Sequence, residues 1–313
     1  MKSMPRVILT GATGFLGSHV VRCLLNHGCS VAVVQRPQSD PWRLSGVLPH
    51  LRVIGADLES ISAVTNEILA FRPDVVVHLA WYGVGNEYRN DPHQVRNIQL
   101  SLALLEVAHR AGCSAWVGLG SQAEYGIQDR IISEDSPTHP VTLYGAAKLA
   151  ACLLAQRLCE LHGMRFVWLR LFSAYGAADN PSWMIPYVIL TLLRGNRPAL
   201  TAGVQRWDYL FAEDAAEAIY RASTAPSVQG IFNLGSGQAH TVRSIAERIR
   251  DEIDPRLPLG FGEKPYGPGQ IMHLQADISR LRLAIGWSPT VGHDEGIPRT
   301  VEWFRDNQWR YEH

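Results

Sequence analysis

Short apolar segments alternate with longer segments of helical periodicity along the first half of the chain. Six runs are hydrophobic at nearly every position, which predicts strands buried on both faces, at 6–10, 30–36, 51–58, 74–80, 115–121 and 166–172. The segments 97–112 and 144–163 carry apolar residues at helical spacing, and each ends at a glycine. Buried strands separated by helices predict an α/β protein with a doubly wound parallel sheet.

The alternating pattern loosens after residue 172. A further helix is predicted within 181–195, and another strand and helix within 230–250. We therefore expect a main domain at 1–172, with returns of the chain to it near 205–240. The rest, 173–313, is expected to form a smaller, interleaved α/β lobe that binds the substrate.

Composition narrows the range of partners. The formal net charge is zero over 313 residues, which gives no support for nucleic acid or membrane partners. Five cysteines without paired spacing indicate reduced thiols and a cytoplasmic protein. The twelve histidines form no metal-binding motif, so no metal site is expected.

A glycine-rich loop joins the first predicted strand to the first predicted helix. Gly11, Gly14 and Gly17 have the spacing G-x-x-G-x-x-G. Glycines allow a tight turn and close approach of a pyrophosphate, and the helix N-terminus supplies unpaired N–H groups. The loop predicts a dinucleotide-binding domain of the Rossmann type.

The end of the second strand predicts which dinucleotide is bound. An NAD site usually carries an acid there, whereas this chain has Gln35 and Arg36. A guanidinium can bind a 2′-phosphate, which favours NADP(H), although a solvated surface arginine is the alternative. Asp57 and Leu58 could contact the adenine, or they could be a helix N-cap and a core residue.

Tyr144 and Lys148 lie four residues apart at the start of a predicted helix, and therefore share a face. The chain has few lysines (Lys2, Lys148 and Lys264), so such a pair is expected by chance only about 0.1 times. An ammonium beside a phenol favours the phenolate and lowers the phenol pKa. The pair predicts acid–base chemistry on a substrate oxygen.

These motifs together resemble the extended short-chain dehydrogenase/reductase superfamily, and in particular its nucleotide-sugar epimerase, dehydratase and reductase branch. Further matching segments include "HLA" at 78–80, "GSQAEYG" at 120–126, "FNLGSG" at 232–237 and "LAIGWSP" at 283–289. The resemblance implies a homodimer and an NAD(P)-dependent oxidoreductase with these cofactor-binding residues: Gly11, Thr13, Gly14, Phe15, Leu16, Gly17, Arg36, Asp57, Leu58, Leu79, Ala80, Asn97, Tyr144, Lys148 and Leu171.

The same resemblance implies that Ser121 is catalytic together with Tyr144 and Lys148. The 4,6-dehydratases of this branch carry an Asp-Glu pair directly after the serine, where this chain has Gln122 and Ala123. Elimination of water is therefore not expected. Glu124 could bind a sugar hydroxyl or be structural.

Two activities remain within this resemblance. A reductase of the C4 keto group of a nucleotide-linked 4-keto-6-deoxyhexose, similar to the CDP-abequose and CDP-paratose synthases, is favoured by Arg36. The alternative is an NAD-dependent 4-epimerase, and a non-catalytic NADPH-binding protein is a third interpretation.

The substrate contacts depart from those of many relatives. Trp207 and Ser173 stand where an arginine and an asparagine are common. Expected substrate-binding residues are Gln122, Glu124, Ser173 and Arg206, while the base and the sugar are not predicted.

Overall fold

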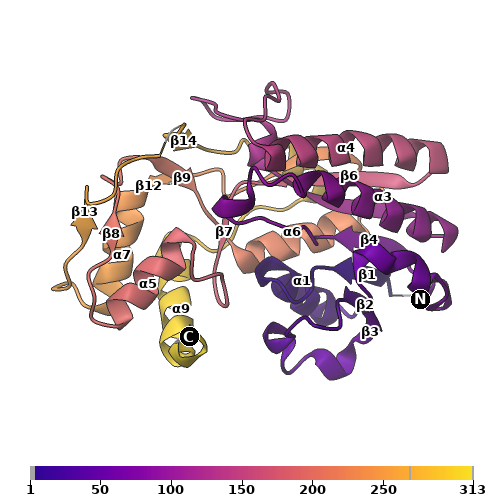
Figure 1. Cartoon of the computed structure of the whole chain (residues 1–313), viewed down its shortest axis with the longest axis horizontal. Helices are drawn as coiled ribbons and strands as arrows, with labels where there is room; N and C mark the ends of the chain where they lie inside the picture. The colour runs from indigo at the N-terminus through magenta and orange to yellow at the C-terminus, as the bar shows by residue number, and fades with distance from the viewer. Residues whose placement is uncertain (1–3, 268, 312–313) are drawn as a thin grey trace.

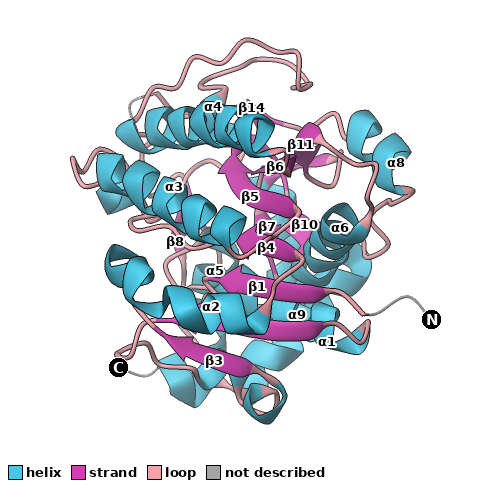
Figure 2. Cartoon of the chain, turned by 90° about the vertical axis from the view of Figure 1, so that its right-hand side faces the viewer, coloured by secondary structure: helices cyan, strands magenta, loops and turns pink. Residues whose placement is uncertain are grey.

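Seven parallel strands form the central sheet of the computed structural model, which describes residues 4–267 and 269–311. Their order across the sheet is β11-β6-β5-β4-β1-β2-β3, and Figure 2 shows the sheet with β3 near one edge and β11 near the other. The strands are β1 (Arg6–Thr10), β2 (Ser30–Gln35), β3 (Arg52–Gly55), β4 (Val75–His78), β5 (Ala115–Ser121), β6 (Arg165–Leu171) and β11 (Gly230–Leu234). The predicted doubly wound sheet is confirmed, and β1 and β5 have the predicted limits.

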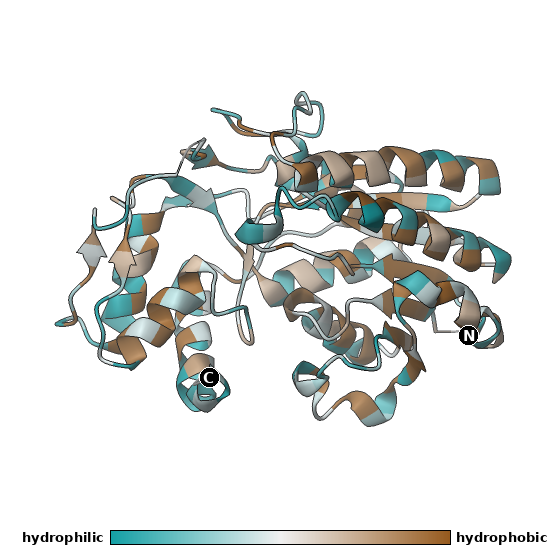
Figure 3. Ribbon diagram, viewed as in Figure 1, coloured by the Kyte–Doolittle hydropathy of each residue, from teal (hydrophilic) through white to brown (hydrophobic). Residues whose placement is uncertain are grey.

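Helices cover both faces of this sheet because its side chains alternate between two apolar cores. Val7 and Leu9 of β1 belong to one core, and Ile8 between them belongs to the other. The first core is covered by α1 (Phe15–Asn26), α6 (Ala212–Thr224) and α8 (Ser279–Ile285). The second is covered by α2 (Thr65–Phe71), α3 (Gln94–Arg110) and α4 (Leu143–His162). Figure 3 shows the resulting concentration of hydrophobic residues in the central strands.

A smaller lobe lies beyond one end of the sheet (Figure 1). Its own core packs α5 (Met184–Leu193), α7 (Val242–Ile253) and α9 (His293–Asp306) together through side chains such as Ile189, Ile245 and Phe304. Short strands outside the central sheet form three small sheets. In two of them, β7 (Ala174–Tyr175) pairs with β10 (Leu210–Phe211) and β8 (Ala199–Leu200) with β13 (Gly260–Phe261). In the third, β9 (Arg206–Asp208) pairs with both β12 (Ala239–Thr241) and β14 (His273–Leu274).

The chain crosses between the two parts more than once. After β10 it enters α6, which packs against α1, and then β11, which pairs with β6 in the central sheet. Only then does it return to β12 and α7. The pattern along the sequence did not predict α6, whose alanine-rich segment carries few large apolar residues.

The strand order reverses at β1, because β2 and β3 lie on one side of it and β4, β5 and β6 on the other. Ligands of open α/β sheets bind at such a reversal, beyond the carboxyl ends of the strands. The register aligns Thr10 with His78, His78 with Gly118, and Ser121 with Leu171. The polar residues at the carboxyl ends of these strands therefore lie along one edge of the sheet.

No described helix combines the length and apolar character needed to cross a bilayer.

Candidate active site

The glycine loop packs tightly at the end of β1. Gly11 has φ +77°, and a Cβ there would lie 2.8 Å from the backbone nitrogen of Ala80. A Cβ on Gly17 would overlap the carbonyl oxygen of Gly11, so the helix can approach the loop only with glycine at this position. Both glycines are thus required by the close packing of β1, α1 and the end of β4.

The N-terminus of α1 is the polar feature of this loop. Gly14 occupies the N-cap position and offers no side-chain acceptor, so the N–H groups of the first turn lack an intrahelical partner. Thr13, Gly14 and Phe15 are partly or fully exposed, whereas Leu16 is buried in the core and could contribute only its backbone. The geometry fits a pyrophosphate held by backbone N–H groups.

Arg36 lies at the rim of this region, directly after β2. Its side chain is exposed, and no carboxylate of the described residues pairs with it. On the next strand Asp57 caps the 3-10 turn Leu58–Val64 by accepting from the Glu59 N–H, and Leu58 packs partly into the core. The N-cap and core interpretations of Asp57 and Leu58 therefore describe contacts that are present.

A directed chain of hydrogen bonds fixes the end of β4. Ser101 donates to the carbonyl oxygen of Asn97, so its hydroxyl oxygen accepts from Nε2 of His78 at 2.9 Å. His78 Nδ1 then accepts from Thr10 Oγ1 at 2.8 Å, and Thr10 accepts from the N–H of Ala80. Burial lowers the pKa of His78 to about 3, and Lys148 adds to this effect. The imidazole is neutral and holds Ala80, one of the residues expected to contact the cofactor.

Asn97 holds a loop that follows β4. Its amide nitrogen donates to the carbonyl oxygen of Tyr82, and its amide oxygen accepts from the N–H of Tyr82. Gln94, one turn earlier on α3, donates to Gly83 and Tyr88 and accepts from the indole of Trp81. Asn97 is buried, and its polar atoms are used by the protein. These contacts give Asn97 a role in shaping the loop, and its expected contact with the cofactor stays a prediction.

Ser121, Tyr144 and Lys148 come together as the sequence predicts. Ser121 ends β5, while Tyr144 and Lys148 lie on successive turns of α4, and each is at most 8% exposed. The Ser121 hydroxyl lies near enough to the Tyr144 phenol to act on its pKa. Lys148 Nζ lies 6.0 Å from the centre of the Tyr144 ring and donates to the carbonyl oxygen of Leu119 at 2.7 Å.

The protonation of this group differs from the expectation. Burial raises the pKa of Tyr144, although the Ser121 hydroxyl and the Arg89 guanidinium 5.1 Å from the ring centre act in the opposite direction. Burial also lowers the pKa of Lys148 to about 7. Tyr144 is therefore a protonated phenol at neutral pH. The lysine ammonium does not lower its pKa as expected, because Lys148 faces the Leu119 carbonyl and the Trp81 ring.

Glu124 lies beneath the catalytic serine and is completely buried. One carboxylate oxygen accepts from the N–H of Ser121 and from the indole of Trp168, and the other accepts from Arg170 Nε at 2.7 Å. Ser121 Oγ in turn accepts from the N–H of Ala123, which completes a capping box. Each of these contacts is made with the protein itself, which favours the structural alternative for Glu124 over a contact with a sugar hydroxyl.

Gln122 is the polar side chain that remains without a partner beside Ser121. It is 6% exposed, and its amide oxygen is buried with no hydrogen bond among the described residues. An unsatisfied buried oxygen is costly unless a ligand or water meets it. Gln122 is therefore suited to donate to or accept from a substrate, but it cannot act as an acid or base.

Trp207 and Ser173 contact each other on the lobe side of the site. The indole nitrogen of Trp207 donates to Ser173 Oγ at 2.8 Å. Because side chains alternate along a strand, Arg206 points to the opposite face of β9, where it donates to the carbonyl oxygen of Ala239. Arg206 is thus not brought to the site by this geometry. Leu171 is the last residue of β6 and lies opposite Ser121 in the register of β5 and β6, at the carboxyl edge of the sheet.

Sequence reasoning missed three contributors to this geometry. Trp81 and Arg170 were not singled out, and His78 was named only within the segment "HLA" without a role, because each acts through a partner from a distant segment. For Arg170 the available signal was the single arginine in the apolar segment "FVWLRLF", since a charged residue in an apolar strand needs a buried partner.

The sheet, the glycine loop and the Ser121–Tyr144–Lys148 group define a dinucleotide-dependent oxidoreductase of the short-chain dehydrogenase/reductase type. The model of the NAD dependent epimerase/dehydratase family matches residues 7–235. The chain belongs to this family.

Characterised relatives match along nearly the whole chain. It is 29% identical to the dTDP-glucose 4,6-dehydratase of Streptomyces niveus, covering 97% of this chain and 94% of the relative. It is 28% identical to the UDP-glucose 4-epimerase of Azospirillum brasilense, covering 96% and 92%. The family members it resembles thus include both dehydratases and epimerases.

Solved structures show the same likeness. The UDP-glucose 4-epimerase of Thermus thermophilus in complex with NAD superimposes with a TM-score of 0.86 at 28% identity, over 96% of this chain and 99% of that one. The UDP-N-acetylglucosamine 4-epimerase of Methanobrevibacter ruminantium, bound to UDP-N-acetylmuramic acid, gives 0.88 at 26%, over 97% and 99%.

Proposed function

We propose that the protein is an NADPH-dependent reductase of the C4 keto group of a nucleotide-linked 4-keto-6-deoxyhexose, such as a CDP-, GDP- or dTDP-sugar. The observation that carries the proposal is the composition of the site next to Ser121. A complete Ser–Tyr–Lys group is present, whereas Gln122 and Ala123 leave no acid and base for dehydration. Such a site can reduce a ketone but cannot create one by elimination of water.

The residues at the carboxyl edge of the sheet fit NADP(H). The Gly11–Gly17 loop and the N-terminus of α1 would hold the pyrophosphate, and Arg36 would pair with the 2′-phosphate. Leu79 and Ala80 follow β4 and donate their N–H groups to Thr10 at the end of β1, and Leu171 ends β6 opposite Ser121, so all three lie at this carboxyl edge. When bound, NADPH supplies a hydride for the carbonyl carbon.

The chain's own residues manage the proton and the charge on the substrate oxygen. Tyr144 is held protonated by its burial, which is the form required to give a proton to the developing alkoxide at C4. Ser121 holds the same oxygen by a hydrogen bond. Lys148 donates to the carbonyl oxygen of Leu119 and lies 6.0 Å from the centre of the Tyr144 ring, so its part would be to hold the nicotinamide ribose beside the phenol.

A 4-epimerase is the second candidate, and the relatives favour it. Two epimerases are 28% identical to this chain over at least 96% of its length. An epimerase must first remove a proton from the C4 hydroxyl, so it needs Tyr144 in its deprotonated form. Arg36, which is exposed at the end of β2 where an NAD site usually carries an acid, supports the reductase instead.

The direct test is a panel of CDP-, GDP-, dTDP- and UDP-linked 4-keto-6-deoxyhexoses with NADPH. We expect stoichiometric oxidation of NADPH with at least one of them, and product two mass units heavier than the ketone. Interconversion of UDP-glucose and UDP-galactose without net cofactor consumption would instead establish the epimerase. Formation of a 4-keto-6-deoxy product from an intact hexose would contradict the argument from Gln122 and Ala123.

We also propose a homodimer that packs through α3 and α4. Val95, Leu153, Leu154 and Leu161 on these helices are large apolar residues with exposed side chains. Such a patch is typical of an interface. Light scattering should give twice the chain mass, and Leu153→Glu should give the monomer. Leu283→Glu, at an exposed leucine of α8, is the matched control and should leave the dimer intact.

A further inference from the structure

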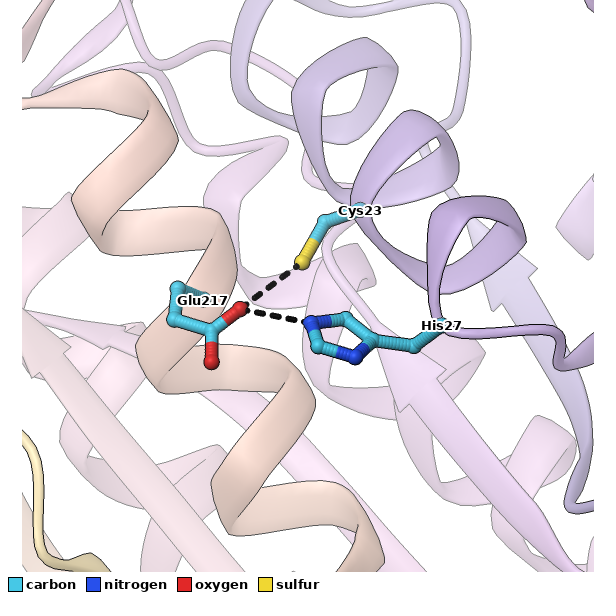
Figure 4. A group of neighbouring side chains, drawn as sticks. All are labelled: Cys23, His27 and Glu217. Atoms are coloured by element: carbon cyan, nitrogen blue, oxygen red, sulfur yellow. Dashed lines mark hydrogen bonds and ion pairs between the residues drawn. The ribbon is translucent and has the colours of Figure 1, made fainter.

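Three side chains with metal-ligating atoms meet on the face of the sheet covered by α1 and α6. Figure 4 shows Cys23 and His27 pointing from α1 toward Glu217 of α6. Oε2 of Glu217 lies 2.8 Å from Nε2 of His27 and 3.5 Å from Sγ of Cys23. The three ligand atoms all lie within 4.8 Å of one another. The cluster shares no residue with the Ser121–Tyr144–Lys148 site.

We propose that Cys23, His27 and Glu217 bind a single divalent cation of the zinc class. Zinc takes thiolate, imidazole and carboxylate ligands at about 2.0 to 2.3 Å in a tetrahedral arrangement, which separates ligand atoms by roughly 3.2 to 3.8 Å. The Cys23–Glu217 separation already fits this range. The His27–Glu217 pair needs to open by about half an ångström, which exposed side chains can provide by small rotations.

The fold orients all three ligands. Cys23 lies in the last turn of α1, and His27, four residues later, is the C-cap residue of the same helix, so the two side chains lie on one side of it. The His27 ring stacks on Tyr220 with centroids 3.8 Å apart and planes 8° from parallel. The other oxygen of Glu217 accepts from Arg221 Nε at 2.6 Å, which directs Oε2 toward the cysteine and histidine. Ligands of metal sites are commonly held in this way by outer hydrogen bonds and packing.

A fourth coordination position is open to solvent. Cys23, His27 and Glu217 line one end of a cleft of about 610 Å³ between the sheet domain and the lobe. Three protein ligands and an accessible fourth position are typical of zinc centres that keep a water or an exchangeable ligand. Asn26 lines the same cleft beside them.

The charges balance when the cation binds. Burial and the neighbouring Glu217 raise the pKa of the Cys23 thiol to about 12, so the free protein carries it as a thiol. Coordination breaks the S–H bond, releases that proton to solvent and forms the metal–thiolate bond. The thiolate and the carboxylate then match the two charges of the ion, and the Arg221 guanidinium stays on the outer oxygen of Glu217. The alternative is a half-exposed His27–Glu217 ion pair with a thiol beside it, a contact of small energetic value.

The sequence does not predict this cluster, because Glu217 lies 190 residues from His27. The spacing Cys-x-x-x-His alone contains two ligands and no recognised motif. The proposal therefore goes beyond the proposed reductase and does not depend on it.

The test is a titration of the full-length, chelator-treated protein with Co²⁺, followed by the charge-transfer absorption of a cobalt–thiolate bond. We expect saturation at one equivalent, release of a proton, and displacement of Co²⁺ by Zn²⁺, which binds the same ligands more tightly. Cys23→Ser should abolish the band, and His27→Gln or Glu217→Gln should weaken binding at least tenfold. Cys113→Ser, at a buried thiol on the opposite face of the sheet, should keep the band.

Several results would overturn the proposal. These are the absence of a saturable band, a band that survives in Cys23→Ser, or equal loss in Cys113→Ser. A zinc-induced rise of the melting temperature in the wild type that persists unchanged in Glu217→Gln would also contradict it. Circular dichroism of each variant separates loss of ligands from loss of fold, and His27→Gln and Glu217→Gln test the site without touching a core thiol.

Discussion

The ammonium of Lys148 lies against the face of the Trp81 indole, with Nζ 3.8 Å from the ring centre. The indole is itself fixed, because its N–H donates to Gln94, a fully buried side chain of α3. A cation over an aromatic face is stabilised in its charged form. Trp81 therefore opposes the burial that lowers the pKa of Lys148, and it positions the amine of the catalytic group.

The first prediction concerns pH. Burial lowers the pKa of Lys148 to about 7, so its charged form is lost as the pH rises through that value. We expect kcat/KM of the reductase to fall above about pH 7, because this quantity reports groups of the free enzyme. Trp81→Leu should move the fall to lower pH, whereas Trp81→Phe should keep most of the wild-type profile. An unchanged profile in Trp81→Leu would show that the indole does not act on the lysine.

The second prediction concerns the proton donor. Tyr144→Phe keeps the buried ring and removes the hydroxyl, so kcat should fall by roughly 10² to 10⁴ while NADPH still binds. Fluorescence titration with NADPH and steady-state turnover measure the two properties separately. Tyr82→Phe, at an exposed tyrosine of the neighbouring loop, is the control and should retain turnover. Near-normal activity of Tyr144→Phe would remove Tyr144 from the mechanism.

The third prediction concerns the choice of cofactor. Arg36→Ala should raise KM for NADPH by about tenfold or more, because a charge-assisted pair to the 2′-phosphate contributes at least about 1.4 kcal/mol. KM for NADH should change little. Arg52→Ala, an exposed arginine at the start of β3, removes the same charge from the opposite edge of the sheet. If Arg36→Ala weakened both cofactors equally, the guanidinium would not be reading the phosphate.

The fourth prediction concerns stability. Glu124→Gln leaves Arg170 buried without its counter-ion, and breaking a buried ion pair of this kind costs about 3 to 5 kcal/mol. Urea unfolding should show this loss in the free energy of unfolding. Glu160→Gln breaks the exposed pair with Arg157 on α4 and should cost less than about 1 kcal/mol. A small effect of Glu124→Gln would mean that Arg170 finds another acceptor.

The sequence predicts the elements of this site better than its supporting contacts. β1, β5, the glycine loop and the Tyr144–Lys148 pair follow from local patterns of apolar residues and spacing, and the structure contains them all. The role of Glu124 does not follow from local pattern, because it depends on Arg170, 46 residues away on β6. The same holds for Asn97, whose partners on the 81–88 loop are set by how that loop folds back on α3.

The spacing of residues along the sequence also does not determine the electrostatic environment of Tyr144 and Lys148. The interval between Tyr144 and Lys148 predicts a shared helix face, but the pKa of each group depends on burial and on what the amine faces. Leu119 and Trp81 reach Lys148 from other strands and loops. The motif therefore predicts which groups lie together, whereas the packing around them determines their pKa values.

The position of β11 has a consequence for synthesis of the chain on the ribosome. β6 is complete at Leu171, yet the strand that covers its open edge ends at Leu234, after α5 and α6 have been made. Until then the nascent sheet presents a row of unpaired backbone groups on an apolar strand, a template for pairing with other chains. Emerging chains of this protein should consequently depend on chaperones during that interval, and a ribosome stalled before Leu234 should yield an aggregation-prone intermediate.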